Sequence, residues 1–280
     1  SDFRAPRHSV RRPSAAWRDA KGFKGFLAKW NNLASFRSDR KTSNDDPAQG
    51  FNPFILDPAD SLLTALNSSA RNTLYYDRNS RTWSVDHTWQ SDRGKSLLLN
   101  GHETRVRESN LVHVRWNTLP RWTLEAEASS GRSMSNSDLL TGRNYSIAEK
   151  STAPKLSWQP STRMRGVLRF KYTDKLNEAE QGGEHATIQD LGAEFRLNMP
   201  DKGSLQLNTN IVKISYDGTV DSSLGTEMLG GLKPGTNITW SLALQRRISD
   251  HLQVDLTYNG RSSPEIPVVH VGGAQVRAFF

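Results

Sequence analysis

The stretch Trp122-Thr123-Leu124-Glu125-Ala126-Glu127-Ala128 decides the fold class. Apolar and polar side chains alternate in it, so a strand through these residues has one apolar and one polar face. A helix has a period of 3.6 residues and would not keep this pattern. The same alternation recurs along the chain from about Asn72 onward. The clearest segments are 112–117, 122–128, 168–173, 193–199, 238–245 and 252–259.

Composition excludes several classes of protein. The chain has 280 residues, a net charge of +8 and a mean hydropathy of -0.66. No stretch approaches the run of about 18 apolar residues that a membrane-spanning helix needs, whereas a transmembrane β-barrel is compatible with a low mean hydropathy because its strands are apolar on one face only. The absence of cysteine excludes disulfides, thiolate metal sites and cysteine nucleophiles.

The predicted connections between strands alternate in length. Short turns are expected near 119–120, 160–161, 200–203 and 249–250, and longer polar loops at 133–144, 177–185, 218–235 and 261–267. Outer-membrane barrels have this asymmetry, with short periplasmic turns and long extracellular loops. Toward the N-terminus the alternation fades, and short turns are predicted at 78–80, 92–94 and 108–110.

These patterns predict an all-β protein, an antiparallel up-and-down transmembrane β-barrel over residues 71–280. Counting from Asn72 gives about twelve strands, within about ten to fourteen, and bacterial barrels have an even number. Residues 26–37 are candidates for one or two further strands, which would make the chain part of a larger barrel. Residues 1–70 are predicted to be a basic extension or connector with a short helix near 58–67, capped by Asp57 and begun by Pro58.

The last strand places small and apolar residues on one face and ends in an aromatic residue. The residues of that face are Gly272, Ala274, Val276, Ala278 and Phe280. This pattern resembles the β-signal by which the outer-membrane assembly machinery recognises its substrates, and the resemblance implies strand addition at a sheet edge. The alternative is an ordinary final strand that ends in Phe.

Several further stretches resemble the C-terminal β-barrel region of large, poorly characterised outer-membrane proteins of the Bacteroidota. The resemblance extends from about Asn52 to the end and implies an outer-membrane barrel at the end of a longer envelope protein, without implying an activity. The stretches are Asn52-Pro53-Phe54, Arg71-Asn72-Thr73-Leu74-Tyr75-Tyr76, Lys95-Ser96-Leu97-Leu98-Leu99-Asn100-Gly101, Leu156-Ser157-Trp158-Gln159-Pro160, Gly182-Gly183-Glu184, Glu227-Met228-Leu229, Leu232-Lys233-Pro234-Gly235, Tyr258-Asn259-Gly260-Arg261-Ser262 and residues 270–280.

The polar faces of the predicted strands carry charges of both signs. Inside a narrow barrel we expect these side chains to pair across strands and fill the lumen, because buried charges must be paired or hydrated. A pore lined by the same residues is the alternative. The predicted charge network consists of Arg115, Glu125, Glu127, Arg169, Lys171, Glu194, Arg196, Arg247, Asp255 and Arg277.

Tryptophans lie near predicted strand ends or on apolar faces, which is typical of the aromatic girdles at the two membrane interfaces. Core packing in a soluble sheet is the alternative. The predicted interface residues are Trp83, Trp89, Trp116, Trp122, Trp158 and Trp240.

Motifs for chemistry are absent from the sequence. The histidines do not fall at zinc-ligand spacing, and the paired glycines lack the helix and the Lys-Ser/Thr of a phosphate-binding loop, so no metal or cofactor is expected. Basic residues are spread through the strands, which argues against nucleic acid. A lipid hydrolase would need a Ser facing a His, such as His113 or His270, on adjacent strands.

The sequence therefore predicts a non-enzymatic outer-membrane anchor or scaffold, part of a larger envelope protein that holds other domains or partners at the membrane. Its expected partners are outer-membrane lipid or lipopolysaccharide, the assembly machinery during insertion, and other envelope proteins. The alternatives are a component of a channel or protein-translocation complex and a barrel-embedded lipid hydrolase. A soluble β-sheet covered by partner chains would share the period-two pattern.

Overall fold

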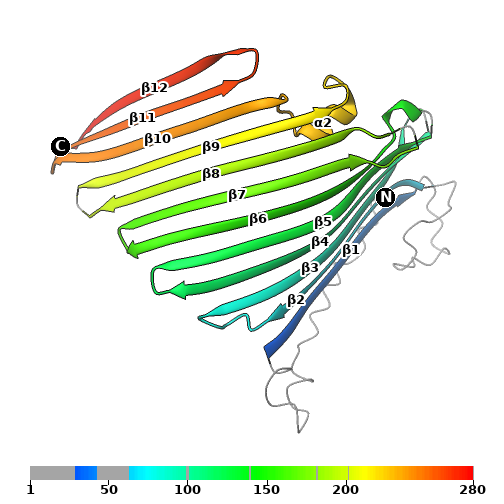
Figure 1. The fold of residues 1–280 in the computed structure, drawn as a ribbon, viewed down its shortest axis with the longest axis horizontal. Helices are drawn as coiled ribbons and strands as arrows, with labels where there is room; N and C mark the ends of the chain where they lie inside the picture. Colours follow the sequence, from blue (N-terminus) through cyan, green and yellow to red (C-terminus); the bar gives the residue numbers. More distant parts are fainter. Residues whose placement is uncertain are drawn as a thin grey trace, which may run out of the picture.

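Twelve strands form one antiparallel sheet in which every strand pairs with its neighbours in sequence, from β1 to β12 (Figure 1). The computed structural model describes residues 29–42, 63–98, 101–138, 140–180, 182–200 and 202–279. The strands are β1 (Trp30–Thr42), β2 (Leu63–Tyr76), β3 (Trp83–Leu98), β4 (Gly101–Leu119), β5 (Trp122–Ser137), β6 (Tyr145–Ser161), β7 (Met164–Asn177), β8 (His185–Met199), β9 (Gly203–Asp217), β10 (Gly235–Ser249), β11 (Leu252–Ser263) and β12 (Ile266–Ala278).

The sheet is twisted and curls around on the side of β1 to β4, while β1 and β12 form its two edges (Figure 1). Among the described residues, no ladder joins β1 to β12, so the up-and-down antiparallel sheet is observed and its closure into a barrel is not. Because β1 and β12 run antiparallel in an even-stranded meander, their free edges have the orientation that closure requires.

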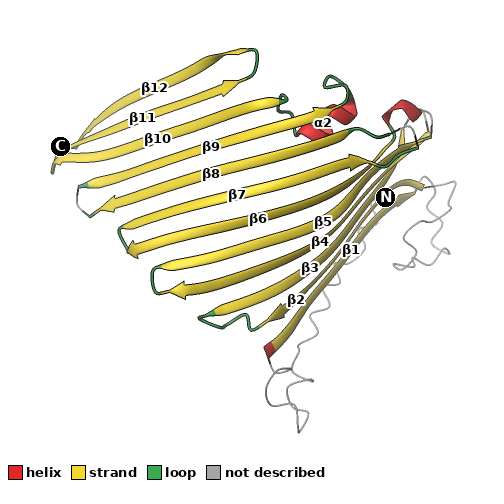
Figure 2. Ribbon diagram, in the orientation of Figure 1, coloured by secondary structure: helices red, strands yellow, loops and turns green. Residues whose placement is uncertain are grey.

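Connections at the two ends of the strands differ in length, as the sequence predicts. One end has turns of two to three residues after β4, β6, β8 and β10, and the six-residue turn 77–82 after β2. The other end carries the 3-10 helix η2 (Thr141–Arg143) and the helix α2 (Ser223–Leu229), which Figure 2 shows on the same side of the sheet. We call this side the long-loop end. The predicted loop 261–267 is too long, because β11 continues to Ser263 and β12 begins at Ile266.

Two predicted turns, at 92–94 and 108–110, are wrong. Both lie inside long strands, and Asp92 is the register partner of Arg107. The physical reason is that outward-facing apolar residues end near Trp89 while the backbone ladder continues to Leu98, so the alternation fades although the strand does not. The hairpin lies further on, where Leu98 pairs with Gly101, whose φ is 102°.

The N-terminal predictions are partly wrong. The strand number of twelve agrees with the sequence estimate, but β1 and most of β2 precede Asn72, so the sheet begins before residue 71. The predicted helix near 58–67 lies outside the described residues up to 62, and from Leu63 onward the chain is β2. Ladders to β1 and β3 override the local capping pattern there.

Few large apolar side chains are buried. Apart from Leu63 and Leu66 of β2, the buried apolar residues gather at the long-loop end beneath α2. They are Ile147, Ala186, Val212, Ile214, Met228 and Leu229. Inter-strand backbone hydrogen bonds rather than a central core therefore dominate the described fold.

The turn between β8 and β9 depends on Gly203. Its φ is 134°, and a Cβ there would lie 1.9 Å from the backbone oxygen of Gln245 on β10. We predict that Gly203→Ala lowers the free energy of unfolding by about 3 kcal/mol, through backbone strain and a clash that only backbone movement can relieve. Urea unfolding of the detergent-solubilised protein, followed by tryptophan fluorescence, measures it. Gly142→Ala is the matched control, since a Cβ there meets nothing within 4 Å; equal midpoints for the two variants would contradict the prediction.

Candidate functional site: the two faces of the sheet

One face of the sheet presents a continuous band of exposed apolar side chains. Residues paired in register share a face, and Trp116, Leu124, Leu156 and Leu168 are successive partners on β4 to β7. Trp116 is 53% exposed and Leu168 is 50% exposed. The band continues over β8 to β11 through the partners Phe195, Leu207, Leu242 and Tyr258. We call this the apolar face; contiguous exposed apolar surface of this extent marks contact with a membrane or a partner.

Aromatic rings line the apolar face at the short-turn end. The ring centroids of Trp30 and Tyr76 lie 5.1 Å apart, and those of Tyr76 and Trp83 lie 5.2 Å apart. Trp83 is the register partner of Trp116. Further along, the centroids of Trp122 and Trp158 lie 5.9 Å apart. The belt therefore runs from β1 to β6, and Trp30 and Tyr76 are members that the sequence analysis missed.

The other two predicted tryptophans also lie on the apolar face but not at strand ends. Trp89 lies in the interior of β3, opposite Asn110 of β4, where the apolar band ends. Trp240 lies in β10, and its ring covers Gly260, where an added Cβ would be 2.1 Å from a ring carbon. The six tryptophans thus share one face, and four of them lie beside short turns.

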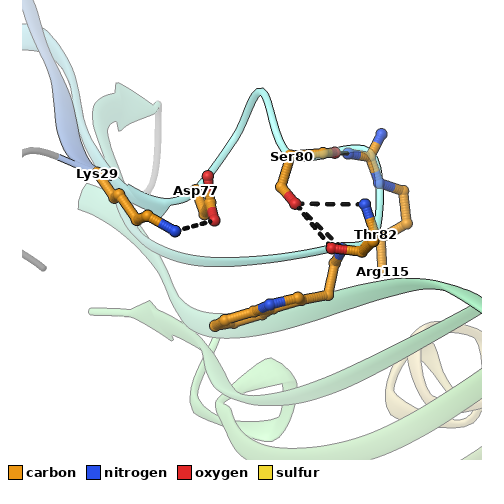
Figure 3. A network of polar contacts seen from close by, with 6 residues as sticks. Lys29, Asp77, Ser80, Thr82 and Arg115 are labelled. Carbon is orange, nitrogen blue, oxygen red and sulfur yellow. Dashed lines mark hydrogen bonds and ion pairs between the residues drawn. The ribbon is translucent and has the colours of Figure 1, made fainter. Parts of the chain in front are cut away.

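Polar contacts fix the first short turn, residues 77–82, to its neighbours (Figure 3). Lys29 donates to the Asp77 carboxylate at 2.8 Å, and this hydrogen bond raises the pKa of Lys29. Arg115 of β4 donates to the backbone oxygen of Ser80 at 3.1 Å, and the hydroxyls of Ser80 and Thr82 are 3.1 Å apart. The turn is therefore tied to both the start of β1 and the polar face of β4.

All ten residues of the predicted charge network lie on the opposite face, which we call the polar face. Arg115, Glu125, Lys155 and Arg169 are successive register partners and form one row across β4 to β7. Each of the other network members lies an even number of residues from the residue that continues this row on its own strand. Three ion pairs join members of the network to residues of the strands. They are Lys155–Glu125 at 2.6 Å, Arg277–Asp255 at 3.4 Å and Arg196–Glu194 at 3.9 Å.

The remaining members are less directly joined. Arg247 lies 3.9 Å from Asp250 in the adjoining turn, and the Arg169 side chain packs across Gly192 of β8. Glu127 is exposed, and so is Lys171. Among the pairs that the predicted network lacks are His113–Asp86 at 2.9 Å, Lys175–Glu149 at 3.7 Å and Arg105–Glu103 at 2.6 Å. The charges therefore form local pairs rather than one continuous network.

On the polar face, one register row across β2 to β7 consists of small hydroxyl side chains except at Leu111 of β4. The hydroxyls of Thr73 and Thr88 are 3.1 Å apart, and those of Ser129 and Ser151 are 2.7 Å apart. Thr173 follows as the partner of Ser151 on β7. The sequence analysis did not identify this row, although serines at every second position near the end of β5 are a visible signal. Small side chains here leave space above the polar face.

The loop between β9 and β10 folds onto the polar face at the long-loop end. Its helix α2 is capped by Ser222, whose hydroxyl accepts from Gly225 N at 2.9 Å, and ends at Gly230 with φ 61°. Met228 packs on Ile147 of β6 and Ala186 of β8. Leu229 packs on Val212 and Ile214 of β9. The sequence analysis expected only a polar loop here; Ser222 and Gly230 were the available capping signals.

The candidate histidines do not contact serine. The partner recorded for His113 is Asp86 on the polar face, and His270 lies on the apolar face 2.8 Å from the Tyr258 hydroxyl. Within the described ranges, no three His, Cys, Asp or Glu residues are grouped as metal ligands. Neither of these two histidines therefore supports the hydrolase alternative, and the absence of an enzymatic role stays a prediction.

The predicted assembly signal occupies an edge of the sheet. Gly272, Ala274, Val276 and Ala278 all lie on the apolar face of β12, and Phe280 lies outside the described residues. In that part of the chain, β12 pairs with β11 alone. An edge strand presents unpaired backbone groups, as strand addition requires.

No family model matches the chain, and no curated protein matches it. Among solved structures, the chain is similar to the translocator domain of autotransporter NalP from Neisseria meningitidis, with 14% sequence identity and a TM-score of 0.31. The match covers 77% of this chain and 80% of that chain. Similarity at this level says nothing about function, and the resemblance to Bacteroidota proteins stays a prediction. No helix in the described ranges is both long and apolar enough to cross a membrane.

The Lys155–Glu125 pair offers a test of how the polar face is stabilised. Both side chains are partly exposed, at 38% and 24%, so solvent screens the pair. We predict a coupling energy of about 0.5 kcal/mol in a double-mutant cycle of Glu125→Gln and Lys155→Gln, measured by urea unfolding. A coupling of several kcal/mol would instead indicate a tightly packed, dehydrated lumen.

Proposed function

We propose that this chain is a β-barrel of the bacterial outer membrane that anchors a larger envelope protein. The observation that carries the proposal is the division of the sheet into a continuous exposed apolar face, bordered by tryptophans at the short-turn end, and a polar face with ion pairs and hydroxyls. A lipid bilayer is the environment that stabilises the apolar face without a protein partner.

Strand length supports the same environment. A tilted strand crosses a bilayer with about 9 to 11 residues, and the strands here have 12 to 19 residues. The excess lies toward the long-loop end, where the outward positions of β3 and β4 change from Trp89 to Arg93 and Glu108. We therefore place the short turns in the periplasm and the long loops outside, and we infer that β1 and β12 pair to close the barrel.

The anchoring role is proposed from the resemblance to the end of long envelope proteins. Outer-membrane lipid, including lipopolysaccharide, would surround the apolar face, and the assembly machinery would receive the free edge of β12. The partner or domain that the barrel holds would be another envelope protein.

Insertion is tested by a pair of adjacent substitutions on opposite faces. Leu168 lies on the apolar face, while Val167 lies on the polar face opposite Glu194. In a bilayer we predict that Leu168→Arg lowers the free energy of unfolding by about 2 to 4 kcal/mol, because it places a charge in lipid, and that Val167→Arg has a much smaller effect. Urea unfolding in lipid vesicles measures both variants.

Insertion of the unsubstituted protein is examined in isolated membranes. Membranes washed with carbonate and urea should retain the protein, and boiled and unboiled samples should differ in gel mobility, as a closed barrel does. Release by the wash, together with equal stability of Leu168→Arg and Val167→Arg, would disprove membrane insertion and indicate a soluble sheet covered by partner chains.

A second candidate function, a hydrophilic conduit, is favoured by the row of hydroxyls. A twelve-stranded barrel is wider than the eight-stranded barrels whose interior side chains fill the lumen, and small residues such as Ser129 and Ser151 fill little of it. Ion pairs on the polar face are partly exposed, which is the state expected beside water. This differs from the plugged lumen that the sequence analysis expected.

The conduit is tested by placing a large side chain in the row of hydroxyls. We predict that the closed barrel conducts ions in planar bilayers and that Ser129→Trp lowers the conductance, because an indole then projects from the middle of the polar face. Ser130→Trp is the matched control, since its side chain lies on the apolar face and should leave the conductance unchanged. An inserted but silent barrel would leave the anchor as the function; equal conductance of both variants would argue against passage along the polar face.

A further inference from the structure

Within the described ranges, buried apolar residues of the polar face form clusters at the long-loop end, and these clusters hold α2. Ile147, Ala186 and Ile214 are among their strand residues. Met228 is fully buried against them, and Leu229 is 3% exposed. Burial of two large side chains on three strands stabilises the loop in this position.

The loop also fits closely where it approaches its own chain. Gly225 of α2 is buried, and a Cβ there would lie 2.5 Å from the backbone oxygens of Thr219 and Val220. Together with the Ser222 cap and the left-handed Gly230, this contact fixes the path of residues 218–234. The loop is therefore a built element of the barrel mouth and not a solvated connection.

The helix α2 packs on two register rows of the polar face that each contain an arginine of β4. Arg105, a serine of β5 and Tyr145 are successive register partners, and Tyr145 packs against the Met228 cluster. Arg107 belongs to the next row, which reaches Ile147 beneath Met228. Glu103 forms an ion pair with Arg105 at 2.6 Å. Glu227 is exposed on α2, beside the buried Met228.

We propose that the β9–β10 loop narrows the long-loop mouth of the barrel and that Glu227, on the helix that packs on the rows of Arg105 and Arg107, sets the charge preference of small ions passing there. The inference rests on the conduit proposed above. A ring of opposed charges in a narrow aqueous path discriminates ions by their sign. Removal of the Glu227 charge makes this part of the mouth more positive, and removal of the Arg105 charge makes it more negative.

The test measures reversal potentials of the full chain in planar bilayers under a KCl gradient. Glu227→Gln should raise the chloride-to-potassium permeability ratio about twofold, and Arg105→Gln should lower it by a similar factor, as expected for one charge beside a hydrated path. Glu180→Gln, which removes an exposed acid from the β7–β8 loop, should leave the ratio unchanged. Unchanged ratios in all three variants would overturn the proposal.

Loop placement is tested separately in the inserted protein. The chain has no cysteine, so Met228→Cys combined with Ile147→Cys gives a single possible cross-link. A short bifunctional thiol reagent should join the two positions and raise the gel mobility of the boiled, unfolded protein, because the closed loop makes the unfolded chain more compact, whereas Glu180→Cys with Ile147→Cys should not be joined. Failure to cross-link in a protein that shows the heat-dependent shift would overturn the proposal.

These outcomes separate the inference from the proposed function. Absence of insertion would disprove the barrel itself. An inserted barrel without conductance would disprove the charge filter and leave the anchor intact. A conducting barrel with insensitive permeability ratios would leave the conduit intact and disprove the role of Glu227.

Discussion

The register of the backbone ladder is the constraint on which the rest of the structure depends. Side chains alternate between the two faces at every residue. A slip of one position between two strands would therefore move every side chain of the slipped strand to the other face. In β6, Leu156 lies on the apolar face and Lys155 on the polar face, and their partners on β5 and β7 match them. A slip there would place Lys155 among leucines and separate it from Glu125, which makes the observed register strongly favoured.

This constraint explains how a sheet with so small a core keeps two distinct surfaces. The buried apolar residues lie in β2 and beneath α2, while most of the apolar face is exposed. Ion pairs such as Lys155–Glu125 are partly exposed and contribute little to stability, because water screens them. The ladder bonds therefore hold the strands, and the surroundings of each face determine whether the arrangement is stable. A bilayer on the apolar face and water on the polar face satisfy both requirements.

The sequence predicts those parts of the fold in which alternation and turns coincide. The second half of β4, strands β5, β7, β8, β10 and β11, and the short turns after β4, β6, β8 and β10 follow from period-two patterns bounded by turn residues. Alternation does not predict the strands beyond the apolar band, because both faces of β3 and β4 become polar there while the backbone ladder continues. It also fails at Leu63, where pairing with neighbouring strands overrides a local helical signal. Whether a residue has an odd or even position in its strand predicts the face on which each predicted charge and tryptophan lies. It does not predict which charges form ion pairs, because pairing depends on the register between strands.

The position of α2 follows from a departure from the same alternation. Ile147 and Ile214 are apolar residues on the polar face, and parity alone would count them as errors in the pattern. Their burial beneath Met228 and Leu229 explains why they are apolar. A loop that folds onto the polar face must bury apolar surface to offset the entropy lost when it is ordered. Such a patch would be costly beside water if the loop pointed outward. Apolar residues at polar-face positions near a long loop are therefore a sequence signal for a loop that folds onto the polar face of the sheet.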